Sequence, residues 1–541
     1  MRLLYLAFFY RINMFIMKKY LILFILWTAF LSCKSVKNET SVFTIKSSEN
    51  YKVPVFDDIG RLDKIRKTFG VIDSIFKDAA LKNNYPGLAI GIVVDGELVH
   101  NANFGYTDID KKIPVTSSSM FRIASMSKSF TSLAILHLRD LGKLNLDDPV
   151  GKYIPEMANQ ISLTSDAPQI TIRHCLSHNT GLPEDNPWGD RQLQDSDKEL
   201  LALLDSGLAF SNIPGVAYEY SNLGFALLGR IITKVSGMPY QQYIKKTILM
   251  PLNMSDTDWE YSHIDRSRLA LGYRWLDGKY RDEALLHDNP DGSWGAMGAM
   301  ISSIDEFARY MSLHLSAWPP RSGEDKGPVG RTSVREMHKP WNFSGFNPNY
   351  KYPDGRTCAT ANAYGYGLRW TKDCDDKLYI GHSGGLPGFG SQWQIMPDYG
   401  IGVVSLANRT YAGTGGVNMQ VLDYIVKNAG LKPRYIPTSD ILNIRKNELM
   451  ALLPDWIGAE SSGIFAENFF PDFILPVLKK QSQDLFSRAG KILKIQDFVA
   501  DNQLRGTFII EGQNTNLQVY FTLTPENPPL IQEYRIREVN K

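Results

Sequence analysis

The chain has 541 residues, of which 43% are hydrophobic and 21% are charged, and this ordinary globular usage excludes a disordered chain, a coiled coil and a multi-span membrane protein. Lysine and arginine number 59 against 57 acidic residues, so the net charge of +2 gives no electrostatic footprint for nucleic acid. The 43 glycines and 28 prolines are too scattered for a collagen-like or low-complexity protein.

Residues 1–33 are predicted to be a signal peptide. Lys18 and Lys19 precede a short apolar run that ends in a small residue, an order typical of secretory signals. The run is shorter than the ~20 residues that a membrane-spanning helix needs. Cys33 directly follows it, as at a bacterial lipoprotein processing site where the cysteine is lipidated; an uncleaved anchor helix is the alternative. We therefore expect an exported protein of the bacterial cell envelope, either a membrane-anchored lipoprotein or a periplasmic protein.

Residues 34–60 are polar and are expected to form a tether, followed by a large folded unit over residues 61–432. Apolar residues recurring at intervals of three and four predict a helix that begins at Arg61 and stops before Tyr85. An Asp-Gly pair at 95–96 separates two apolar runs, which predicts a two-residue β-hairpin.

A helical region extends from the 120s to about residue 320, and the stretch 317–360, rich in proline, glycine and asparagine, is expected to be a long surface excursion. Strands are then predicted at 378–381, 390–396 and 401–407, and a helix at 417–428. A helix and a hairpin open this unit, and strands and a helix close it. The pattern therefore predicts an α+β fold, in which helices flank one antiparallel sheet and a helical subdomain is inserted.

Residues 433–439 are predicted to be a linker and residues 440–541 a small α+β accessory domain. Apolar runs on both sides of residues 512–514 predict a hairpin there. This domain carries no combination of acid, base and nucleophile.

Three cysteines lie beyond the signal segment. Cys358 and Cys374 could pair in an oxidising compartment, but an odd number cannot all pair, and we expect free thiols, as for Cys175. His174 and His178 have metal-ligand spacing but lack the glutamate of a zinc-protease helix, so they are expected to cap and pack one turn. No metal and no cofactor is predicted.

Ser125 and Lys128 form a Ser-x-x-Lys element at the start of a long apolar helix. A serine in a first helical turn lies near unpaired N–H groups and the positive end of the helix dipole. Lys128, one turn further on, can reach its hydroxyl and, if partly buried, can act as a base. A second copy, Ser74 and Lys77, lacks this setting, and a plain helix cap is the alternative for Ser125.

Tyr220 and Asn222 form a Tyr-x-Asn element before another apolar helix. A phenol with a lowered pKa beside an ammonium group can relay a proton, and the amide can bind both a substrate carbonyl and the lysine. A core tyrosine with a capping asparagine is the alternative.

The third element is Gly381-His382-Ser383-Gly384-Gly385, at the end of a predicted strand. The glycines let the backbone approach a ligand and offer N–H groups to an oxyanion. His382 can supply polarity or a proton near neutral pH. A structural histidine is the alternative reading.

Together, the order and spacing of these elements resemble the serine β-lactamase and penicillin-binding-protein superfamily, which combines Ser-x-x-Lys, a Ser/Tyr-x-Asn element and a Lys-Thr-Gly strand. The tyrosine resembles the class C-like branch, and His-x-Gly in place of Lys-Thr-Gly resembles its D-alanyl-D-alanine carboxypeptidase, D-aminopeptidase and esterase members. The resemblance covers residues 65–430. It implies a β-lactamase/transpeptidase-like fold, with 61–432 as the catalytic domain.

The resemblance also implies a role for each matching residue. Ser125 would be the nucleophile, activated by Lys128, and Tyr220 would share the duties of base and leaving-group acid. Asn222 and the strand segment would bind substrate, with His382 where a lysine usually contacts a substrate carboxylate, so that charge there becomes pH-dependent. The remaining implied residues are Ser383 and Gly384 for substrate binding and the backbone N–H groups of Ser125 and Gly385 for the oxyanion hole.

The expected activity is serine hydrolysis through an acyl-enzyme, on a D-alanyl peptide, a D-amino-acid peptide, an ester or a β-lactam. The expected partners are such a small-molecule or peptide substrate and a membrane, reached through the N-terminal lipid or anchor. An inactive, lipid-tethered binding protein that uses the same cleft is one alternative. The other is an α/β-hydrolase with Ser383 as nucleophile, because Gly-His-Ser-Gly-Gly also fits Gly-x-Ser-x-Gly, although that elbow requires a helix directly afterwards.

Overall fold

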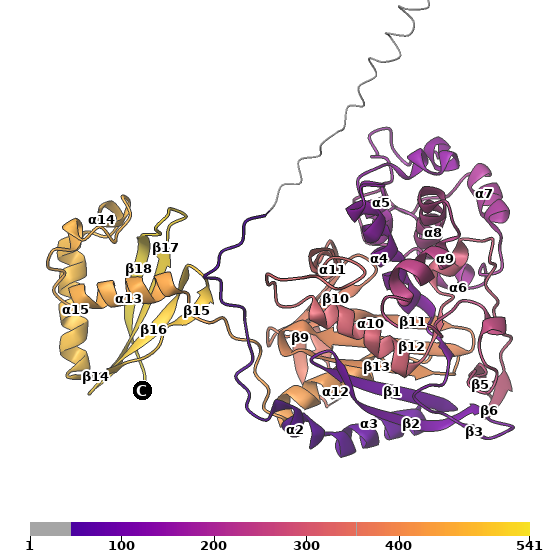
Figure 1. The fold of residues 1–541 in the computed structure, drawn as a ribbon, viewed down its shortest axis with the longest axis horizontal. Helices are drawn as coiled ribbons and strands as arrows, with labels where there is room; N and C mark the ends of the chain where they lie inside the picture. Colours follow the sequence, from indigo (N-terminus) through magenta and orange to yellow (C-terminus); the bar gives the residue numbers. More distant parts are fainter. Residues whose placement is uncertain (1–44, 353) are drawn as a thin grey trace, which may run out of the picture. The chain divides into compact units, whose positions relative to one another are not determined.

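The computed structural model describes residues 45–352 and 354–541 (Figure 1). The predicted signal peptide, the lipidation candidate Cys33 and the first part of the tether lie outside these residues. Within the described residues, no helix combines the length and the apolar composition that crossing a membrane requires.

A nine-stranded antiparallel sheet forms the centre of the larger unit. β1 (Gly87–Val94) and β2 (Glu97–Asp108) form the predicted hairpin, whose two turn residues, Asp95 and Gly96, both have positive φ angles, as a two-residue turn requires. The strand order is β3-β2-β1-β13-β12-β11-β10-β9-β8, so the first and last parts of the domain meet where β1 pairs with β13. The other strands are β3 (Ile113–Pro114), β8 (Asn342–Lys351), β9 (Thr357–Tyr364), β10 (Arg369–Asp373), β11 (Leu378–Leu386), β12 (Phe389–Met396) and β13 (Ile401–Ala407).

Helices cover both faces of this sheet, and every residue of β1 is buried as a result. On one face, α12 (Gly415–Asn428) packs against β12, β13 and α3 (Phe69–Lys82); on the other, α10 (Ile304–Ser316) packs against β1, β2 and β13 (Figure 1). Successive side chains of β13 enter different cores: Val403 joins the core of α3 and α12, and Val404 joins the core of α10. The predicted α+β architecture is confirmed.

The single helix expected from Arg61 to just before Tyr85 is two helices, α2 (Arg61–Arg66) and α3. The Thr68 hydroxyl donates a hydrogen bond to the carbonyl oxygen of Ile65 at 2.6 Å, a local bond that competes with the helical pattern. The apolar spacing located the buried face correctly but gave no sign of this turn.

The stretch 317–360 is not the surface excursion that its composition predicts. It contains α11 (Arg331–Met337) and all but the end of the β8–β9 hairpin, which extends the sheet beyond β11. β8 is an edge strand with mostly exposed side chains, so it lacks the alternation of apolar and polar residues that reveals a half-buried strand.

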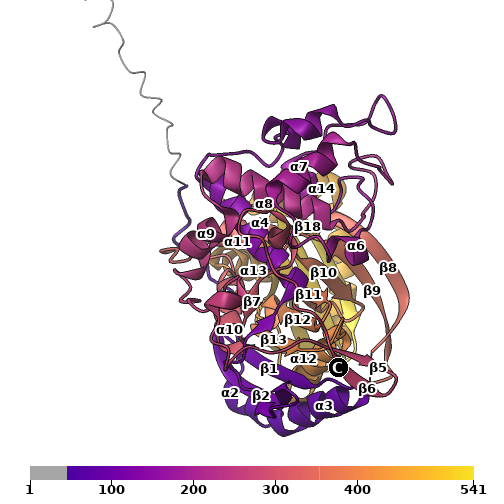
Figure 2. The ribbon, with the colours of Figure 1, turned by 90° about the vertical axis from the view of Figure 1, so that its right-hand side faces the viewer.

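The helical subdomain is inserted between β4 (Phe121–Arg122) and β7 (Ile301–Ser302), which pair with each other. Its centre is α4 (Ser127–Asp140), which packs against α8 (Asn222–Ser236) (Figure 2). The smaller elements are η1 (Ala124–Met126), η2 (Val150–Lys152), η3 (Pro155–Asn159), α5 (Ile172–Leu176), α6 (Asn186–Gly189), α7 (Asp197–Asp205), α9 (Tyr240–Ile244), η4 (Lys245–Leu249), η5 (Tyr261–His263), β5 (Tyr273–Leu276), β6 (Lys279–Asp282) and η6 (Trp294–Met297).

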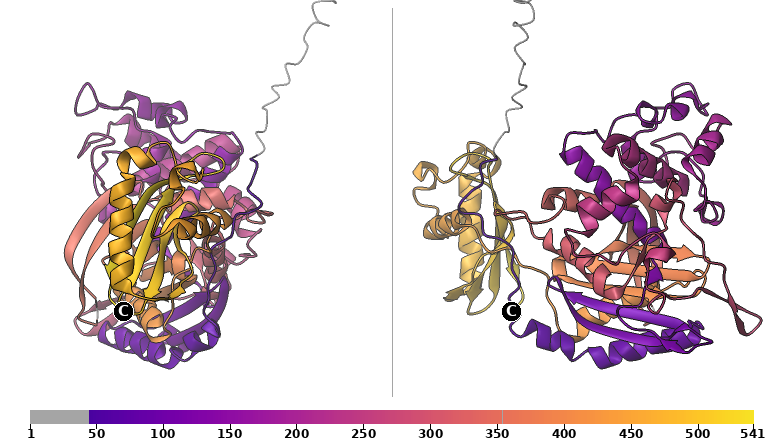
Figure 3. Two further views of the ribbon diagram at one scale, coloured as in Figure 1. Left: turned by 90° about the vertical axis from the view of Figure 1, so that its left-hand side faces the viewer. Right: turned by 45° about the vertical axis from the view of Figure 1, so that its right-hand side comes forward.

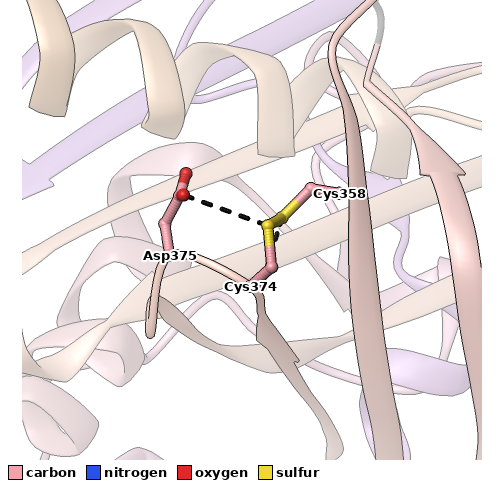
Figure 4. A group of neighbouring side chains, drawn as sticks. All are labelled: Cys358, Cys374 and Asp375. Atoms are coloured by element: carbon pink, nitrogen blue, oxygen red, sulfur yellow. Dashed lines mark hydrogen bonds between the residues drawn. A yellow bond between two sulfur atoms is a disulfide. The ribbon is translucent and has the colours of Figure 1, made fainter.

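Cys358 and Cys374 form a disulfide, which corrects the expectation of free thiols (Figure 4). Asp373 of β10 lies opposite Thr360 of β9, so Cys374, one residue after Asp373, comes close to Cys358, two residues before Thr360, with their Cα atoms 5.6 Å apart. Counting cysteines misled because Cys175 is a buried free thiol that takes no part in pairing.

Residues 440–541 have an apolar core of their own and a five-stranded antiparallel sheet (Figure 3). The hairpin predicted around residues 512–514 is confirmed as β16 (Arg505–Gly512) and β17 (Asn516–Leu523). The other elements of this region are α13 (Asp440–Leu452), η8 (Ala459–Ser461), α14 (Phe469–Asp472), α15 (Leu475–Ala489), β14 (Ile492–Ile495), β15 (Val499–Asn502) and β18 (Ile531–Val539); η7 (Pro397–Tyr399) belongs to the larger unit, between β12 and β13.

Candidate active site

Ser125 lies on the tight turn η1, between β4 and the buried helix α4. Ala124 has a φ angle of 50°, which is unusual for a residue with a side chain and places the next residue at the helix start. The turn is held from the segment opposite: the Ile123 N–H donates to the carbonyl oxygen of Met300 at 2.9 Å, and the Met300 N–H donates to the Ser127 hydroxyl at 3.1 Å. The Ser125 residue is only 7% exposed.

Lys128 lies one turn further along α4 and is completely buried. Its Nζ atom is 3.2 Å from Ser125 Oγ, 2.7 Å from Asn222 Oδ1 and 2.7 Å from the carbonyl oxygen of Met297. The two carbonyl oxygens can only accept hydrogen bonds, so a neutral amine donates its two N–H bonds to them and directs its lone pair at the serine hydroxyl. The geometry is that of a base aimed at Ser125.

The charge state of Lys128 suits this arrangement. Burial lowers the pKa of Lys128 to about 7, although the nearby carboxylates of Asp190 and Asp185 act in the opposite direction. Aromatic rings enclose the amine, with the ring centroids of Tyr220 and Phe225 at 4.9 Å and 5.5 Å from Nζ. A substantial fraction of the amine is therefore neutral near pH 7 and able to accept a proton.

Tyr220 and Asn222 reach the site from the start of α8. Ser221 is the N-cap of this helix, and the Asp185 carboxylate accepts hydrogen bonds from the N–H groups of Asn222 and Leu223 at 2.6 Å and 2.9 Å. These caps fix the helix start, so the Asn222 side chain holds its position against Lys128.

The Tyr220 side chain lies beside that of Ser125, but its charge state differs from the expectation. Burial raises the pKa of Tyr220 well above its usual range, whereas a lowered pKa was predicted. The correction follows from the surroundings: the ring lies against His178, with centroids 4.2 Å apart, and the apolar neighbourhood outweighs the nearby cations. Tyr220 therefore stays protonated and can donate, while the basic group is Lys128.

The third sequence element lies in the middle of β11, beside the turn that carries Ser125. A methyl group placed on Gly384 would come within 2.2 Å of the carbonyl oxygen of Ile123, so only glycine permits this approach. One placed on Gly385 would lie 2.9 Å from the ring of Tyr411. Ser383 is half-buried on the same strand. Strand and turn are thus in direct contact, as an oxyanion site between Ser125 and Gly385 would need.

His382 is completely buried and is not the pH-dependent cation that the sequence predicts. Its Nδ1 atom lies 2.5 Å from the carbonyl oxygen of Ser383 and therefore donates, which leaves Nε2 to accept from the Tyr364 hydroxyl at 2.7 Å. Burial, with Arg369 and Lys128 nearby, holds the pKa of His382 well below its usual range. The imidazole is a neutral, fully hydrogen-bonded part of the site.

Arg369 supplies a positive charge that the sequence analysis missed. It begins β10, opposite Gly381 of β11, and is exposed to solvent. Its guanidinium lies 5.6 Å from the ring centroid of Tyr220 and beside the side chain of Tyr218. Desolvation of the guanidinium lowers the pKa of Arg369, but the nearby tyrosines outweigh it and raise the pKa, so its charge does not depend on pH in the physiological range.

The alternative with Ser383 as nucleophile is not supported by the local fold. A nucleophile elbow requires a helix directly after the serine. Here β11 continues to Leu386 and returns as β12, so Ser383 lies within an antiparallel hairpin.

The histidine pair behaves as predicted. His174 and Thr171 form a reciprocal capping box at the start of α5, and the Nδ1 atom of His178 accepts the N–H of Ser221 at 3.1 Å. Among the described residues, the one group with metal-ligand spacing is Cys358, Cys374 and Asp375, but both sulfur atoms belong to the disulfide (Figure 4).

The sequence matches one protein-family model and is similar to several known proteins. The protein-family model described as Beta-lactamase matches residues 72–424. Protein flp of Staphylococcus aureus strain N315 is 30% identical over 391 residues, covering 70% of this chain and 70% of that protein. Beta-lactamase-like protein 2 of Dictyostelium discoideum is 27% identical over 517 residues, covering 89% and 87%.

Two solved structures share the fold at lower sequence identity. The octameric penicillin-binding protein homologue from Pyrococcus abyssi has a TM-score of 0.54 at 22% identity, covering 86% of this chain and 99% of that one. The penicillin-binding protein from Bacillus halodurans has a TM-score of 0.51 at 22% identity, covering 65% and 98%. The match of the family model includes Ser125, Lys128, Tyr220, Asn222 and the β11 segment.

Proposed function

We propose, from the premise that the chain belongs to the Beta-lactamase family, that this protein is a serine hydrolase that forms an acyl-enzyme on Ser125. The observation that carries the proposal is the setting of Lys128: it is completely buried, it is bonded to two carbonyl oxygens, and its Nζ is 3.2 Å from the serine hydroxyl. An inactive binding protein would not need a lysine held near neutrality at this place.

The proposed reaction has two halves. Lys128 accepts the hydroxyl proton of Ser125 while Oγ attacks the carbonyl carbon of the substrate, and the resulting oxyanion lies between the turn and β11. Tyr220 then gives its proton to the leaving group and regains one from Lys128, as the carbon–leaving-group bond breaks. Water, activated by the now neutral Lys128, hydrolyses the acyl-enzyme and restores Ser125.

The leaving group is proposed to carry a free carboxylate. Arg369 is exposed, permanently charged and 5.6 Å from the ring centroid of Tyr220, which is the leaving-group acid in this scheme. A guanidinium binds a carboxylate through two parallel hydrogen bonds. Arg369 thus supplies the charge that the buried, neutral His382 does not.

Export to the cell envelope remains part of the proposal. The disulfide between Cys358 and Cys374 supports it, because disulfides persist in oxidising compartments. The predicted signal peptide and lipidation at Cys33 rest on the sequence pattern alone.

Covalent labelling tests the nucleophile. A fluorophosphonate should add to Ser125, and Ser125→Ala should lose both the adduct and turnover, while Ser383→Ala keeps the adduct. Intact and peptide mass locate the label. An adduct on Ser383, or no Ser125-dependent reaction with any peptide, ester or β-lactam probe, contradicts the proposed function.

Kinetics with matched substrates test the role of Arg369. Arg369→Gln should raise KM for a substrate whose leaving group has a carboxylate, and should change KM little for the corresponding methyl ester. Arg369→Lys keeps the positive charge but not the paired N–H groups of the guanidinium. Its KM for the carboxylate substrate should therefore lie between the values for the wild type and for Arg369→Gln. An equal effect on both substrates would show that Arg369 only supports Tyr218 and Tyr220.

A further inference from the structure

The segment that contains α6 forms a wall of the site beside Asn222. The Asn222 side chain donates to Asn186 Oδ1 at 3.2 Å, and a methyl group on Gly189 would lie 2.8 Å from Asn222 Cβ. The backbone of α6 therefore lies directly against the residue that holds Lys128. Asp190 directly follows Gly189 in the chain, so this contact fixes the position of Asp190 in the site.

Asp190 is a buried carboxylate with unused hydrogen-bonding capacity. The residue is 2% exposed, and its Oδ2 atom accepts from the Tyr411 hydroxyl at 2.9 Å. Within residues 45–352 and 354–541, its Oδ1 atom has no hydrogen-bond partner, whereas the neighbouring Asp185 uses both oxygens to cap α8. Although the residue as a whole is buried, its Oδ1 atom is still reached by solvent, so it is free to accept a hydrogen bond from a ligand.

The carboxylate of Asp190 is close to the reacting groups. It raises the pKa of both Lys128 and Tyr220. The proposed mechanism does not use it: Lys128 is the base, Tyr220 is the acid, and Asp190 contacts neither directly.

Positions along β11 show which end of the site Asp190 occupies. Arg369 lies opposite Gly381, the Ser125 turn contacts Gly384, and Tyr411 packs against Gly385. At about 3.3 Å per residue, the stretch from Gly381 to Gly385 spans about 13 Å. The site therefore has a cation at one end of this stretch, while the turn that carries the nucleophile and Tyr411 lie side by side towards the other end.

We propose that Asp190, presented beside Tyr411, binds the ammonium group of the acyl residue, so that the protein acts on short peptides or depsipeptides with a free amino terminus on one side of the scissile bond and a free carboxylate on the other. The inference rests on the proposed acyl-enzyme function and defines its substrate class. The ammonium group would give Asp190 Oδ1 its missing partner.

The ionisation of Asp190 sets the pH range of this recognition. Burial raises the pKa of Asp190 to about 6, with Tyr411, Lys128 and Arg191 lowering it and Asp185 raising it. The carboxylate is charged above this value, so preference for an ammonium group is lost as the pH falls through about 6. Lys128 is protonated in the same range, so the ratio of two substrates, and not a single rate, must be measured.

The test compares D-alanyl-D-lactate with N-acetyl-D-alanyl-D-lactate, which share the scissile ester and the leaving-group carboxylate. At pH 8 the protein should prefer the free amine in kcat/KM by about tenfold to hundredfold, the size of a hydrogen bond between charged groups. Asp190→Asn should bring the ratio close to one, and Asp205→Asn, which alters an exposed carboxylate at the end of α7, should leave it unchanged.

A second variant keeps the test decisive if Asp190→Asn does not fold. Tyr411→Phe retains the carboxylate but removes a hydrogen bond that lowers its pKa, so the preference should persist at pH 8 and disappear at a higher pH than in the wild type. Asp190→Asn should also shift the acid limb of both substrates equally to lower pH, because Asp190 raises the pKa of Lys128.

Failure of the inference and failure of the proposed function give different results. An unchanged ratio in Asp190→Asn, a wild-type preference for the acetylated substrate, or no turnover of either substrate while Ser125 is still labelled by the fluorophosphonate overturns the inference alone. Absence of any Ser125-dependent labelling or turnover overturns the function on which it rests.

Discussion

Two segments of this chain carry the same Ser-x-x-Lys spacing, but they differ in burial and in their bonding partners. Ser74 and Lys77 lie on an exposed face of α3, where the Ser74 hydroxyl donates to the Gly70 carbonyl oxygen at 3.0 Å. Ser125 and Lys128 lie at the start of α4, where the lysine is completely buried. The comparison teaches that the spacing places two side chains on one helix face, while burial and further partners decide whether they can react.

The further partners are the decisive difference. Lys128 bonds to Asn222 and to the Met297 carbonyl, which come from elements far away in the sequence. Lys77 lies on an exposed part of α3. Burial and bonding partners from distant elements therefore distinguish Lys128 from Lys77.

Replacing each of the two lysines separately by alanine should give the largest difference in kcat/KM. Lys128→Ala removes the base and should lower kcat/KM by about 10²–10⁴-fold, the usual range for a general acid–base group. Lys77→Ala should leave kcat/KM within about twofold, because exposed substitutions away from special features change little. Steady-state kinetics on one reactive ester measures both.

The double variant shows whether Lys128 and Tyr220 act as one relay. Tyr220→Phe in the Lys128→Ala background should add only a small further loss, because groups that pass the same proton fail together. Fully multiplicative losses would contradict a shared relay.

Glycine substitutions probe the surroundings of the two segments. Gly384→Ala would push a methyl group to within 2.2 Å of the Ile123 carbonyl oxygen and so displace the turn that carries Ser125. A displacement of about 1 Å should reduce kcat about 10²-fold. Retained kcat with an unchanged melting temperature would show that β11 does not position the nucleophile.

The pH dependence of turnover should also distinguish Lys128 from Lys77. Lys128 must be neutral to accept a proton, so kcat/KM should rise with pH through about 7. Asn222→Asp places a carboxylate where Oδ1 now lies 2.7 Å from Nζ, which should raise the pKa of Lys128 and move this acid limb upward by about 1–3 pH units. Lys77→Ala should leave the profile in place. An unmoved limb in Asn222→Asp would assign it to another group.

The smallest effect is expected in the exposed segment. A methyl group on Gly70 of α3 meets no atom within 4 Å, so Gly70→Ala should stabilise the protein by about 0.5–1 kcal/mol through higher helix propensity. Denaturant unfolding measures the change, and kcat should stay constant. Destabilisation would mean that the turn at Thr68 depends on this glycine.

Local patterns predicted those parts of the fold whose signals are local. The β1–β2 hairpin follows from a turn sequence, and a helix with one buried face, such as α3, follows from its periodicity. The edge strand β8 escaped because few of its side chains are buried, and β10 escaped because it is short and begins with Arg369. The Cys358–Cys374 disulfide escaped because it depends on the register of β9 against β10.

The residues of the candidate site also fall into those that local sequence patterns revealed and those that such patterns missed. Ser125, Lys128, Tyr220 and Asn222 were found because each stands in a short motif, and the structure brings their side chains together. Arg369 and Asp190 belong to no motif and were missed. No local signal could have found them, because each acquires its meaning from neighbours more than thirty residues away in other elements.

By itself, then, the sequence determined the α+β class and the hairpins, and it singled out the candidate reactive groups, since periodicity, turn chemistry and motif spacing are properties of neighbouring residues. Only the tertiary structure decided their charge states. His382 becomes neutral, Tyr220 stays protonated and Lys128 approaches neutrality, while Arg369 keeps its charge. The physical reason is that a pKa depends on desolvation and on charges brought close by folding, and neither can be read from the residues next to the group in the chain.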